Sequence, residues 1–281
     1  MQSDSAVIFS GGLDSTTLVY DLLHSNYEPH LISFNYGQRH KKELDYAVNT
    51  AFRLGLRHDI IDLSGITHLI SNSALTSVER DIRNKVDGIK TIPGSLMEAA
   101  KEIEVPEGHY AEDNMKATVV PNRNMMMISI ASAIAVSNEY KEVFTGVHAG
   151  DHFVYPDCRP RFINAVNAAV VLGNDGFGPI PEQPAGAYPS KFVQAPFMYL
   201  TKTQIAAKAF ELEVPLEETW SCYKGGDLHC GKCGTCVERL EAIHDASVAL
   251  HGDKAADRNF FDNTRYEDNT FWREAIANAR S

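Results

Sequence analysis

A short apolar run at residues 6–9 leads directly into Ser10-Gly-Gly-Leu-Asp-Ser15, and an amphipathic helical pattern follows over residues 15–25. A buried strand that ends in a glycine turn and opens a helix is the first unit of a parallel α/β sheet. The alternation of strand and helix patterns then continues, which predicts one parallel sheet with right-handed crossovers. The further predicted strands lie at residues 30–34, 57–62, 142–145 and 192–195, and the further helices at 41–54, 125–136, 161–172, 201–212 and 236–250.

This alternation is interrupted once, and it ends before the C-terminus. Residues 63–117 are polar, contain several Gly and Pro residues and are partly helical at 95–103. We interpret them as an insertion over the active-site end of the sheet. We expect a Rossmann-like nucleotide-binding α/β domain at residues 1–212, with Thr201 as the N-cap of its last helix. Residues 213–281 are expected to form a smaller cysteine-containing and helical region.

The loop after the first strand has the composition of a phosphate-binding site. Its glycines allow close approach, and its N–H groups and the helix N-terminus converge on an anion. Asp14 would repel a phosphate unless a cation lay between them, so we assign it to Mg²⁺ and to catalysis. No Gly-Lys-Ser/Thr ending follows, so this is not a loop that transfers the γ-phosphoryl group. The expected nucleotide contacts are Phe9, Ser10, Gly11, Gly12, Leu13, Asp14, Ser15, Thr16, Thr17, Leu18 and Val19.

Four of the five cysteines lie close together near the C-terminus. Cys-x-x-Cys spacing lets two sulfurs bind one ion, and zinc prefers tetrahedral sulfur ligands. Four thiolates leave no open coordination position, so the predicted Zn²⁺ is structural. Reduced buried cysteines or a redox pair are the alternative, His229 could replace one ligand, and Cys158 is expected to be a buried or pocket thiol. The predicted ligands are Cys222, Cys230, Cys233 and Cys236.

The Ser-Gly-Gly-Leu-Asp-Ser loop resembles the PP-loop of the ATP pyrophosphatases, which cleave ATP to AMP and pyrophosphate by adenylating a substrate oxygen. With the cysteine cluster and the motifs at residues 34–40, 120–124, 145–151, 155–161 and 221–225, the chain resembles the QueC family of 7-cyano-7-deazaguanine synthases. The resemblance implies that 7-carboxy-7-deazaguanine, ammonia and ATP react through an adenylated acid, an amide and a second adenylation to the nitrile. It also implies a homodimer with one structural zinc per subunit.

This chemistry brings two anions together, the substrate carboxylate and ATP, and arginines are expected to shield them. Arg123 and Arg159 are the expected catalytic arginines, and Arg39 is a further substrate contact. Surface charge or a structural ion pair is the alternative role for each. Asp151 and Asp157 could hold the guanine-like edge, because a carboxylate accepts hydrogen bonds from N1–H and from the exocyclic amine. Turn capping is the alternative role for these two aspartates.

The segment from His148 to Asp151, His-Ala-Gly-Asp, departs from the Cys-Glu-Thr-Asp that many members of the family carry. This departure bears on the substrate contacts that the resemblance implies for this segment. Three other functions remain open. The chain could stop at the amide or adenylate another carboxylate, it could modify tRNA, or it could be a non-catalytic nucleotide-binding module that recruits a partner.

Composition argues against nucleic acid and membrane partners. The formal net charge of the chain is −11, and binding to a phosphate backbone depends on neutralisation by Lys and Arg. We expect no signal peptide and no membrane-spanning helix, and hence a cytoplasmic location. A PP-loop enzyme that modifies tRNA would need a basic face and usually a catalytic cysteine pair, so the charge and the four-cysteine cluster oppose that function.

Overall fold

Five parallel strands form one sheet in the computed structural model, which describes residues 4–69, 73–76, 104–110, 113–252 and 262–272. The strand order β3-β2-β1-β4-β5 places β1 at the centre, where Val7 pairs with both Leu31 and Phe144. Each of the five predicted strands is confirmed. Their bounds are β1 Ser5–Ile8, β2 Pro29–Asn35, β3 His58–Asp62, β4 Glu142–Phe144 and β5 Val193–Gln194.

Helices connect the strands as the sequence patterns predict. Thr201 is the N-cap of α7: its side chain accepts a hydrogen bond from the N–H of Gln204 at 3.2 Å, and Gln204 Oε1 accepts from the N–H of Thr201 at 2.8 Å. This reciprocal pair is a capping box and confirms the predicted cap. The predicted helix at residues 95–103 lies outside the described residues. The described helices are α1 Leu13–His24, α2 Lys42–Leu54, α5 Arg123–Ser137, α6 Pro160–Gly173, α7 Lys202–Glu211 and α8 Gly234–His251.

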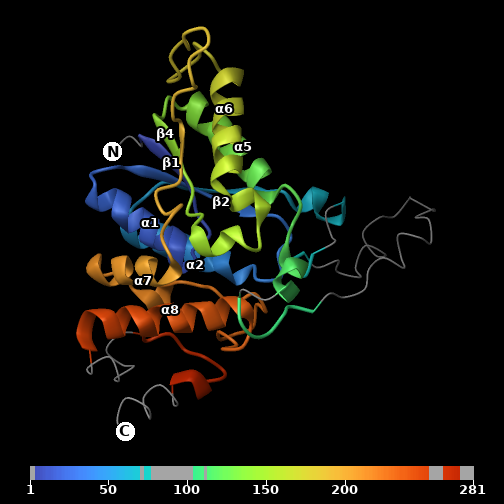
Figure 1. The fold of residues 1–281 in the computed structure, drawn as a ribbon, viewed down its shortest axis with the longest axis vertical. Coiled ribbons are helices and arrows are strands. Elements are labelled where there is room, and N and C mark those ends of the chain that lie inside the picture. The colour runs from blue at the N-terminus through green and yellow to red at the C-terminus, as the bar shows by residue number, and fades with distance from the viewer. Residues whose placement is uncertain (1–3, 70–72, 77–103, 111–112, 253–261, 273–281) are drawn as a thin grey trace, which may run out of the picture.

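Alternate residues of each strand pack against two different layers of helices. Ala6 and Ile32 belong to the hydrophobic cluster that contains residues of α5 and α6, whereas Val7 and Leu31 belong to the one that contains residues of α1 and α2. Because successive side chains of a strand point to opposite faces, both faces of the sheet are buried at β1 and β2. Figure 1 shows α5 and α6 on one side of the sheet and α1 and α2 on the other.

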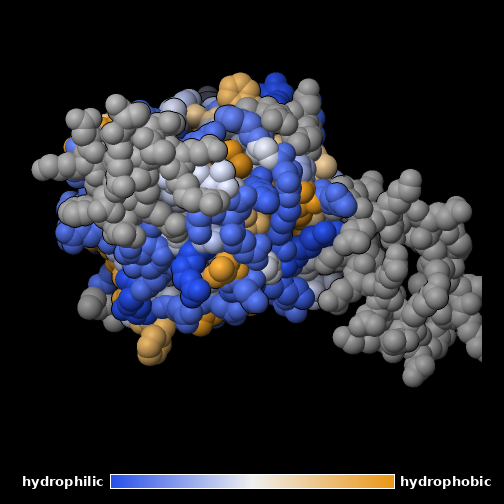
Figure 2. Space-filling view, turned by 90° about the horizontal axis from the view of Figure 1, so that it is seen from below, coloured by the Kyte–Doolittle hydropathy of each residue, from blue (hydrophilic) through white to orange (hydrophobic). Residues whose placement is uncertain are grey.

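Helices α7 and α8 pack on each other and form a layer beyond α1 (Figure 1). Arg239 of α8 is fully buried and donates hydrogen bonds to Leu216 O at 2.7 Å, to Thr264 Oγ1 at 2.9 Å and to Tyr266 Oη at 3.1 Å. These bonds fix the described part of the C-terminal tail to α8. Figure 2 shows that the face beneath this layer is mostly hydrophilic, with hydrophobic residues only in small separate patches.

The segment Met115–Ser137 is long and apolar enough to cross a membrane by length and composition alone, although no such segment is expected from the sequence analysis. Its α5 portion packs on β1, β4 and α6, and Ile128, Ala131 and Ala135 are fully buried. The apolar character of α5 is therefore explained by its place in the core between the sheet and α6. The predicted division into residues 1–212 and 213–281 remains a prediction.

Candidate active site and metal centre

The strand order reverses between β1 and β4, and a cavity lies at the carboxyl ends of these two strands. From β1 the chain proceeds to β2 and β3 on one side, whereas β4 and β5 lie on the other. Ligands of open α/β sheets bind at such a switch point. Residues from the α7–α8 layer complete the wall. The polar side chains that line the cavity include those of Ser10, Asp14, Ser15, Glu43, Arg123, His148, Asp151, Lys202 and Glu238.

Hydroxyl groups hold the loop after β1 in one shape. The Oγ atoms of Ser10 and Ser15 lie 3.1 Å apart, and the N–H of Gly12 donates to Ser10 Oγ at 3.2 Å. Gly11 has a φ of 75°, and a Cβ at this position would lie 2.7 Å from backbone atoms of α2. Both facts require glycine. The carbonyl of Gly11 accepts a hydrogen bond from the N–H of Trp220 at 2.9 Å, so the segment before the cysteine cluster supports the loop.

Asp14 lies in a cluster of opposite charges at one end of the cavity. Lys202 Nζ is 2.5 Å from Asp14 Oδ2 and 3.7 Å from Glu238 Oε2. Burial alone would raise the pKa of Asp14, but the charges of Lys202 and His148 hold this pKa below its usual value. Burial opposes the charge of Lys202, yet Asp14 and Glu238 raise the pKa of its amine. Asp14 Oδ1 is buried and has no hydrogen-bond partner among the described residues, so it could bind a cation.

His148 and Asp151 follow β4 and close this end of the cavity. His148 Nδ1 accepts a hydrogen bond from the N–H of Gly150 at 3.1 Å, which places the proton of a neutral ring on Nε2. That Nε2 lies 3.7 Å from Asp151 Oδ2 and 3.9 Å from Asp14 Oδ2. Tyr110 donates to Asp151 Oδ1 at 3.1 Å. Asp151 therefore lies between His148 and Tyr110, close to Asp14, the predicted ligand of Mg²⁺.

Arg123 and a group of tyrosines line the other end of the cavity. The guanidinium of Arg123 lies over the ring of Tyr155, 5.3 Å from its centroid, and no carboxylate of the described residues forms an ion pair with it. Burial opposes its charge, and the hydroxyl groups of Tyr36, Tyr223 and Tyr155 counter that effect and raise the pKa of Arg123. A half-buried guanidinium that faces a cavity without a carboxylate partner is suited to bind an anionic ligand.

The structure brings together only some of the residues predicted from the sequence. Arg123 and Asp151 line the cavity, but Arg39, Arg159 and Asp157 are not among the described residues that form its wall. Arg159 Nε donates to the carbonyl of His152 at 2.9 Å, and Asp157 Oδ2 accepts from the N–H of Asn124 at 3.0 Å at the start of α5. Of the eleven expected nucleotide contacts, the cavity wall contains Phe9, Ser10, Gly12, Leu13, Asp14 and Ser15.

The remaining expected nucleotide contacts lie deeper in the fold. Leu18 and Val19 are fully buried in the cluster that contains residues of α1 and α2, and Thr17 Oγ1 donates to the carbonyl of Leu13 at 2.7 Å. Thr16 is also fully buried. Gly11 supports the loop through its backbone. These positions shape the start of α1, and none of their side chains is part of the cavity wall.

Sequence reasoning missed several polar side chains of the cavity because they come from distant parts of the chain. Lys202 follows the N-cap of α7, and Glu238 lies in α8 behind the cysteine cluster. Neither belongs to a motif that indicates a ligand. Tyr36 and Tyr223 do lie within the motifs at residues 34–40 and 221–225. Their place in these motifs was the signal that could have identified them as residues of the cavity.

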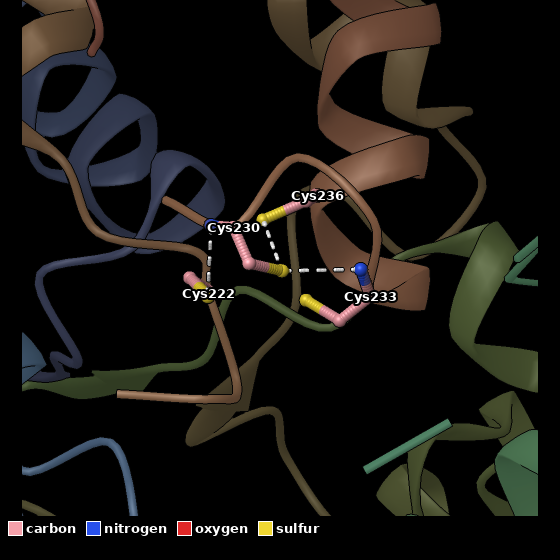
Figure 3. A group of neighbouring side chains, drawn as sticks. All are labelled: Cys222, Cys230, Cys233 and Cys236. Carbon is pink, nitrogen blue, oxygen red and sulfur yellow. Dashed lines mark hydrogen bonds between the residues drawn. The ribbon is translucent and has the colours of Figure 1, made fainter. Parts of the chain in front are cut away.

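The four clustered cysteines form a second site, on the side of the molecule that carries α8. Their Sγ atoms all lie within 4.8 Å of one another, and all four side chains are buried. Figure 3 shows the thiols converging on a common point, with Cys236 in the first turn of α8 and Cys222 on the preceding loop. Backbone N–H groups support the sulfurs: those of Lys232 and Cys233 donate to Cys230 Sγ at 3.4 and 3.2 Å. This donor set fits a tetrahedral metal ion.

His229 and Cys158 are not part of this cluster. His229 Nε2 accepts a hydrogen bond from the N–H of Ser221 at 3.1 Å, and its ring packs on Trp220 with centroids 4.4 Å apart. Burial and the charge of Arg239 lower the pKa of His229 to about 2, so the ring is neutral. Cys158 is buried, lines the cavity and accepts a hydrogen bond from Asn124 Nδ2 at 3.1 Å, in agreement with the expected pocket thiol.

Comparison with known proteins identifies the family. The model of the family described as "Queuosine biosynthesis protein QueC" matches residues 4–97 and 85–247. The chain is 43% identical to 7-cyano-7-deazaguanine synthase from Ruegeria pomeroyi and 44% identical to that from a Chelativorans species, in each case over 96% of this chain and 97% of the relative. The structure of NMN synthetase from Francisella tularensis aligns with 99% of this chain and 84% of its own chain, at 12% sequence identity and a TM-score of 0.42. This similarity is too low to support an argument about function. The chain belongs to the QueC family of queuosine biosynthesis proteins.

Proposed function

We propose that this protein is a carbon–nitrogen ligase that converts 7-carboxy-7-deazaguanine and ammonia into 7-cyano-7-deazaguanine, the nitrile preQ0, at the expense of ATP. Membership of the QueC family and high identity to two named 7-cyano-7-deazaguanine synthases over nearly the whole chain support this activity. The product would serve queuosine biosynthesis. The single structural observation that carries the proposal is that the Asp14 loop and Arg123 line the same cavity. The loop would bind the triphosphate of ATP, and Arg123 would bind the anionic substrate.

The two ends of the cavity suit the two reactants. The loop at residues 10–15 would hold the phosphates of ATP, and Arg123 would hold the substrate carboxylate while the rings of Tyr36, Tyr155 and Tyr223 surround the deazaguanine. A carboxylate oxygen attacks the α-phosphorus, pyrophosphate leaves, and ammonia then displaces AMP to give the amide. The amide oxygen is activated in the same way and leaves as AMP. The first adenylation, of the acid, and the second, of the amide, would develop negative charge at the same place, and Arg123 would stabilise it.

Asp14 is the proposed ligand of Mg²⁺. Its Oδ1 is buried without a hydrogen-bond partner among the described residues, and carboxylate oxygens are the ligands that Mg²⁺ prefers. When bound, the ion would neutralise the phosphate charge. Asp151 could contribute to the same cation or, as expected from the sequence, to the substrate. Lys202 pairs with the other oxygen, Asp14 Oδ2, and would lie beside the phosphates.

The cysteine cluster is the proposed zinc site, with Cys222, Cys230, Cys233 and Cys236 as ligands. Four sulfurs would complete a tetrahedral shell, so the ion would hold the loop before α8 and perform no chemistry. Through the bond between Trp220 N–H and Gly11 O, that loop also supports the phosphate site. The zinc would therefore affect catalysis only by keeping this segment in place.

We also propose a homodimer in the cytoplasm without a nucleic-acid partner. The net charge of −11 supports the last point, because phosphate backbones bind basic surfaces. Large apolar side chains are exposed near the outer end of α6, where Leu172 and Phe177 have exposed fractions of 60% and 65%. They offer a surface that a second copy could cover.

Product analysis tests the proposed function. Purified protein is incubated with 7-carboxy-7-deazaguanine, an ammonium salt, Mg²⁺ and ATP, and the products are identified by liquid chromatography and mass spectrometry. The expected products are the nitrile, pyrophosphate and two molecules of AMP per nitrile. Asp14→Asn should retain the fold and lose this activity. ADP and phosphate in place of AMP would contradict the proposal, and an amide that accumulates would identify an amide synthetase.

A further inference from the structure

A largely buried carboxyl group that the proposed function leaves without a role lies in the wall of the cavity that Arg123 also lines. Glu43 is in the first turn of α2, and its side chain is only 12% exposed. Gln38 Nε2 donates to Glu43 Oε1 at 2.9 Å, and His40 Nε2 lies 3.4 Å from Glu43 Oε2. Gln38 also donates to the carbonyl of Phe34 at 3.0 Å, so the carboxyl group is held on the loop that follows β2.

Burial makes Glu43 able to exchange a proton near neutral pH. Burial raises the pKa of Glu43 to about 7, although the hydrogen bond from Gln38 and the charge of Arg123 act against this rise. Burial and Arg123 lower the pKa of His40 to about 3, so His40 is neutral. Tyr36, which also faces Glu43, has its pKa raised to about 12 by burial and stays protonated. Near neutral pH, Glu43 is the member of this group that changes charge.

The other ionisable groups of the cavity are less suited to accept a proton at this end. Burial raises the pKa of the Cys158 thiol, so it stays protonated. Asp14 forms its ion pair with Lys202, and Glu238 lies 3.7 Å from the same lysine at the phosphate end of the cavity. Arg123, which would bind the reacting carboxylate, influences the pKa of Glu43 directly. Among Asp14, Glu43 and Glu238, Glu43 is the carboxyl group whose pKa is influenced by the charge of Arg123.

We propose that Glu43 is the catalytic base that removes the nitrogen-bound proton when the nitrile forms. This role rests on the proposed function. In the adenylated amide, the N–H proton passes to the Glu43 carboxylate, and the electron pair of that N–H bond becomes the third carbon–nitrogen bond. The carbon–oxygen bond breaks, and AMP leaves with its electron pair. Glu43 then returns the proton to solvent.

The variant Glu43→Gln removes the base with little disturbance of its surroundings. A glutamine Oε1 at this position can still accept the hydrogen bond from Gln38. Its Nε2–H₂ can donate to His40 Nε2 if the imidazole proton moves to Nδ1, which is free to carry it. Glu43→Asp keeps a carboxyl group but moves it by one methylene. Asp45→Asn is the matched control, because Asp45 is an exposed carboxylate in the same helix.

The test supplies the synthetic amide, 7-carboxamido-7-deazaguanine, with Mg²⁺ and ATP and without ammonia, and follows nitrile formation from pH 5.5 to 9. Exchange of labelled pyrophosphate into ATP with the acid substrate reports adenylation separately. The wild type and Asp45→Asn should show a nitrile rate that rises with pH through about 7. Glu43→Gln should lose at least about 100-fold in this rate and lose the rise, while pyrophosphate exchange stays within about threefold of the wild type. Glu43→Asp should recover part of the rate and the pH dependence.

The outcomes separate this proposal from the proposed function. If Glu43→Gln keeps the wild-type rate and pH profile, Glu43 is not the base. If it loses pyrophosphate exchange as strongly as nitrile formation, Glu43 has a binding or structural role and the proposal is wrong. If the wild type itself forms no nitrile from the amide, the proposed function fails irrespective of Glu43.

Discussion

Lys202 Nζ lies 2.5 Å from Asp14 Oδ2, although 187 residues separate the two positions in the chain. The contact joins the first turn of α1 to the first residue of α7. It also gives the carboxylate of the phosphate-binding loop a counter-ion while Oδ1 of Asp14 has no hydrogen-bond partner among the described residues. The contribution of this ion pair to the free energy of unfolding can be measured.

We predict that Lys202→Gln lowers the free energy of unfolding of the ligand-free protein by about 2 to 3 kcal/mol, because a largely buried carboxylate loses its partner. The double variant Asp14→Asn/Lys202→Gln should be less destabilised than the sum of the single variants. Urea denaturation of the four proteins gives this double-mutant cycle. Additive effects would show that the two groups do not stabilise each other.

Arg123→Ala should separate stability from activity. The guanidinium has no ion pair among the described residues, so its removal should leave the free energy of unfolding unchanged or slightly higher. AMP release should fall by about 100-fold or more with both the acid and the amide as substrate. Arg161→Ala, which removes an exposed arginine of α6, is the control. A loss with only one of the two substrates would contradict a shared anion site.

Cys233→Ser should give poorly folded protein without bound metal, because a tetrahedral zinc site cannot lose one of four sulfur ligands without loss of its closed shell. Elemental analysis of the purified wild type should find one zinc per chain. Cys158→Ser should retain both the zinc and the fold, since Cys158 lies outside the cluster. Active wild-type protein that contains no zinc would refute the assignment.

Glu43 should make stability depend on pH in a specific direction. Its pKa is raised from 4.5 to about 7 in the folded state, so its contribution is fully present below pH 4.5 and is lost as pH rises through about 7. Glu43→Gln, which stays neutral, should therefore exceed the wild type in free energy of unfolding by up to about 3 kcal/mol at pH 8. At pH 5 the difference should be much smaller. Urea denaturation at both values checks this, and equal differences at the two pH values would rule it out.

Hydrophobic periodicity was enough to predict the sheet. The inner strands β1 and β2 are buried on both faces, so residues 6–9 are apolar throughout and residues 30–34 are mostly apolar. The helices between the strands show amphipathic spacing. The capping box at Thr201 was also predictable, because it depends on residues three positions apart. The four-cysteine cluster was predictable because Cys230, Cys233 and Cys236 are three positions apart and Cys222 lies a short distance before them in the chain.

The cavity was only partly predictable, because its wall is assembled by tertiary contacts. Asp14 and Arg123 stand in local motifs, but Lys202 and Glu238 meet Asp14 only because α7 and α8 pack together over α1. Nothing in a linear pattern distinguishes Asp151, which faces the cavity, from Asp157, which accepts a backbone hydrogen bond at the start of α5. The orientation of a side chain at a loop depends on the packing around it.

The fate of the substrate oxygens tests the central claim most directly. Substrate labelled with ¹⁸O at both carboxylate oxygens is converted with excess ammonia and ATP, and the AMP, pyrophosphate and water are analysed by mass spectrometry. Two adenylations at one site predict two AMP per nitrile, each carrying one ¹⁸O on its phosphate, and no label in pyrophosphate or water. Label in inorganic phosphate or water would contradict adenylation, and one labelled AMP with ¹⁸O retained in an amide would show that the reaction stops before the nitrile.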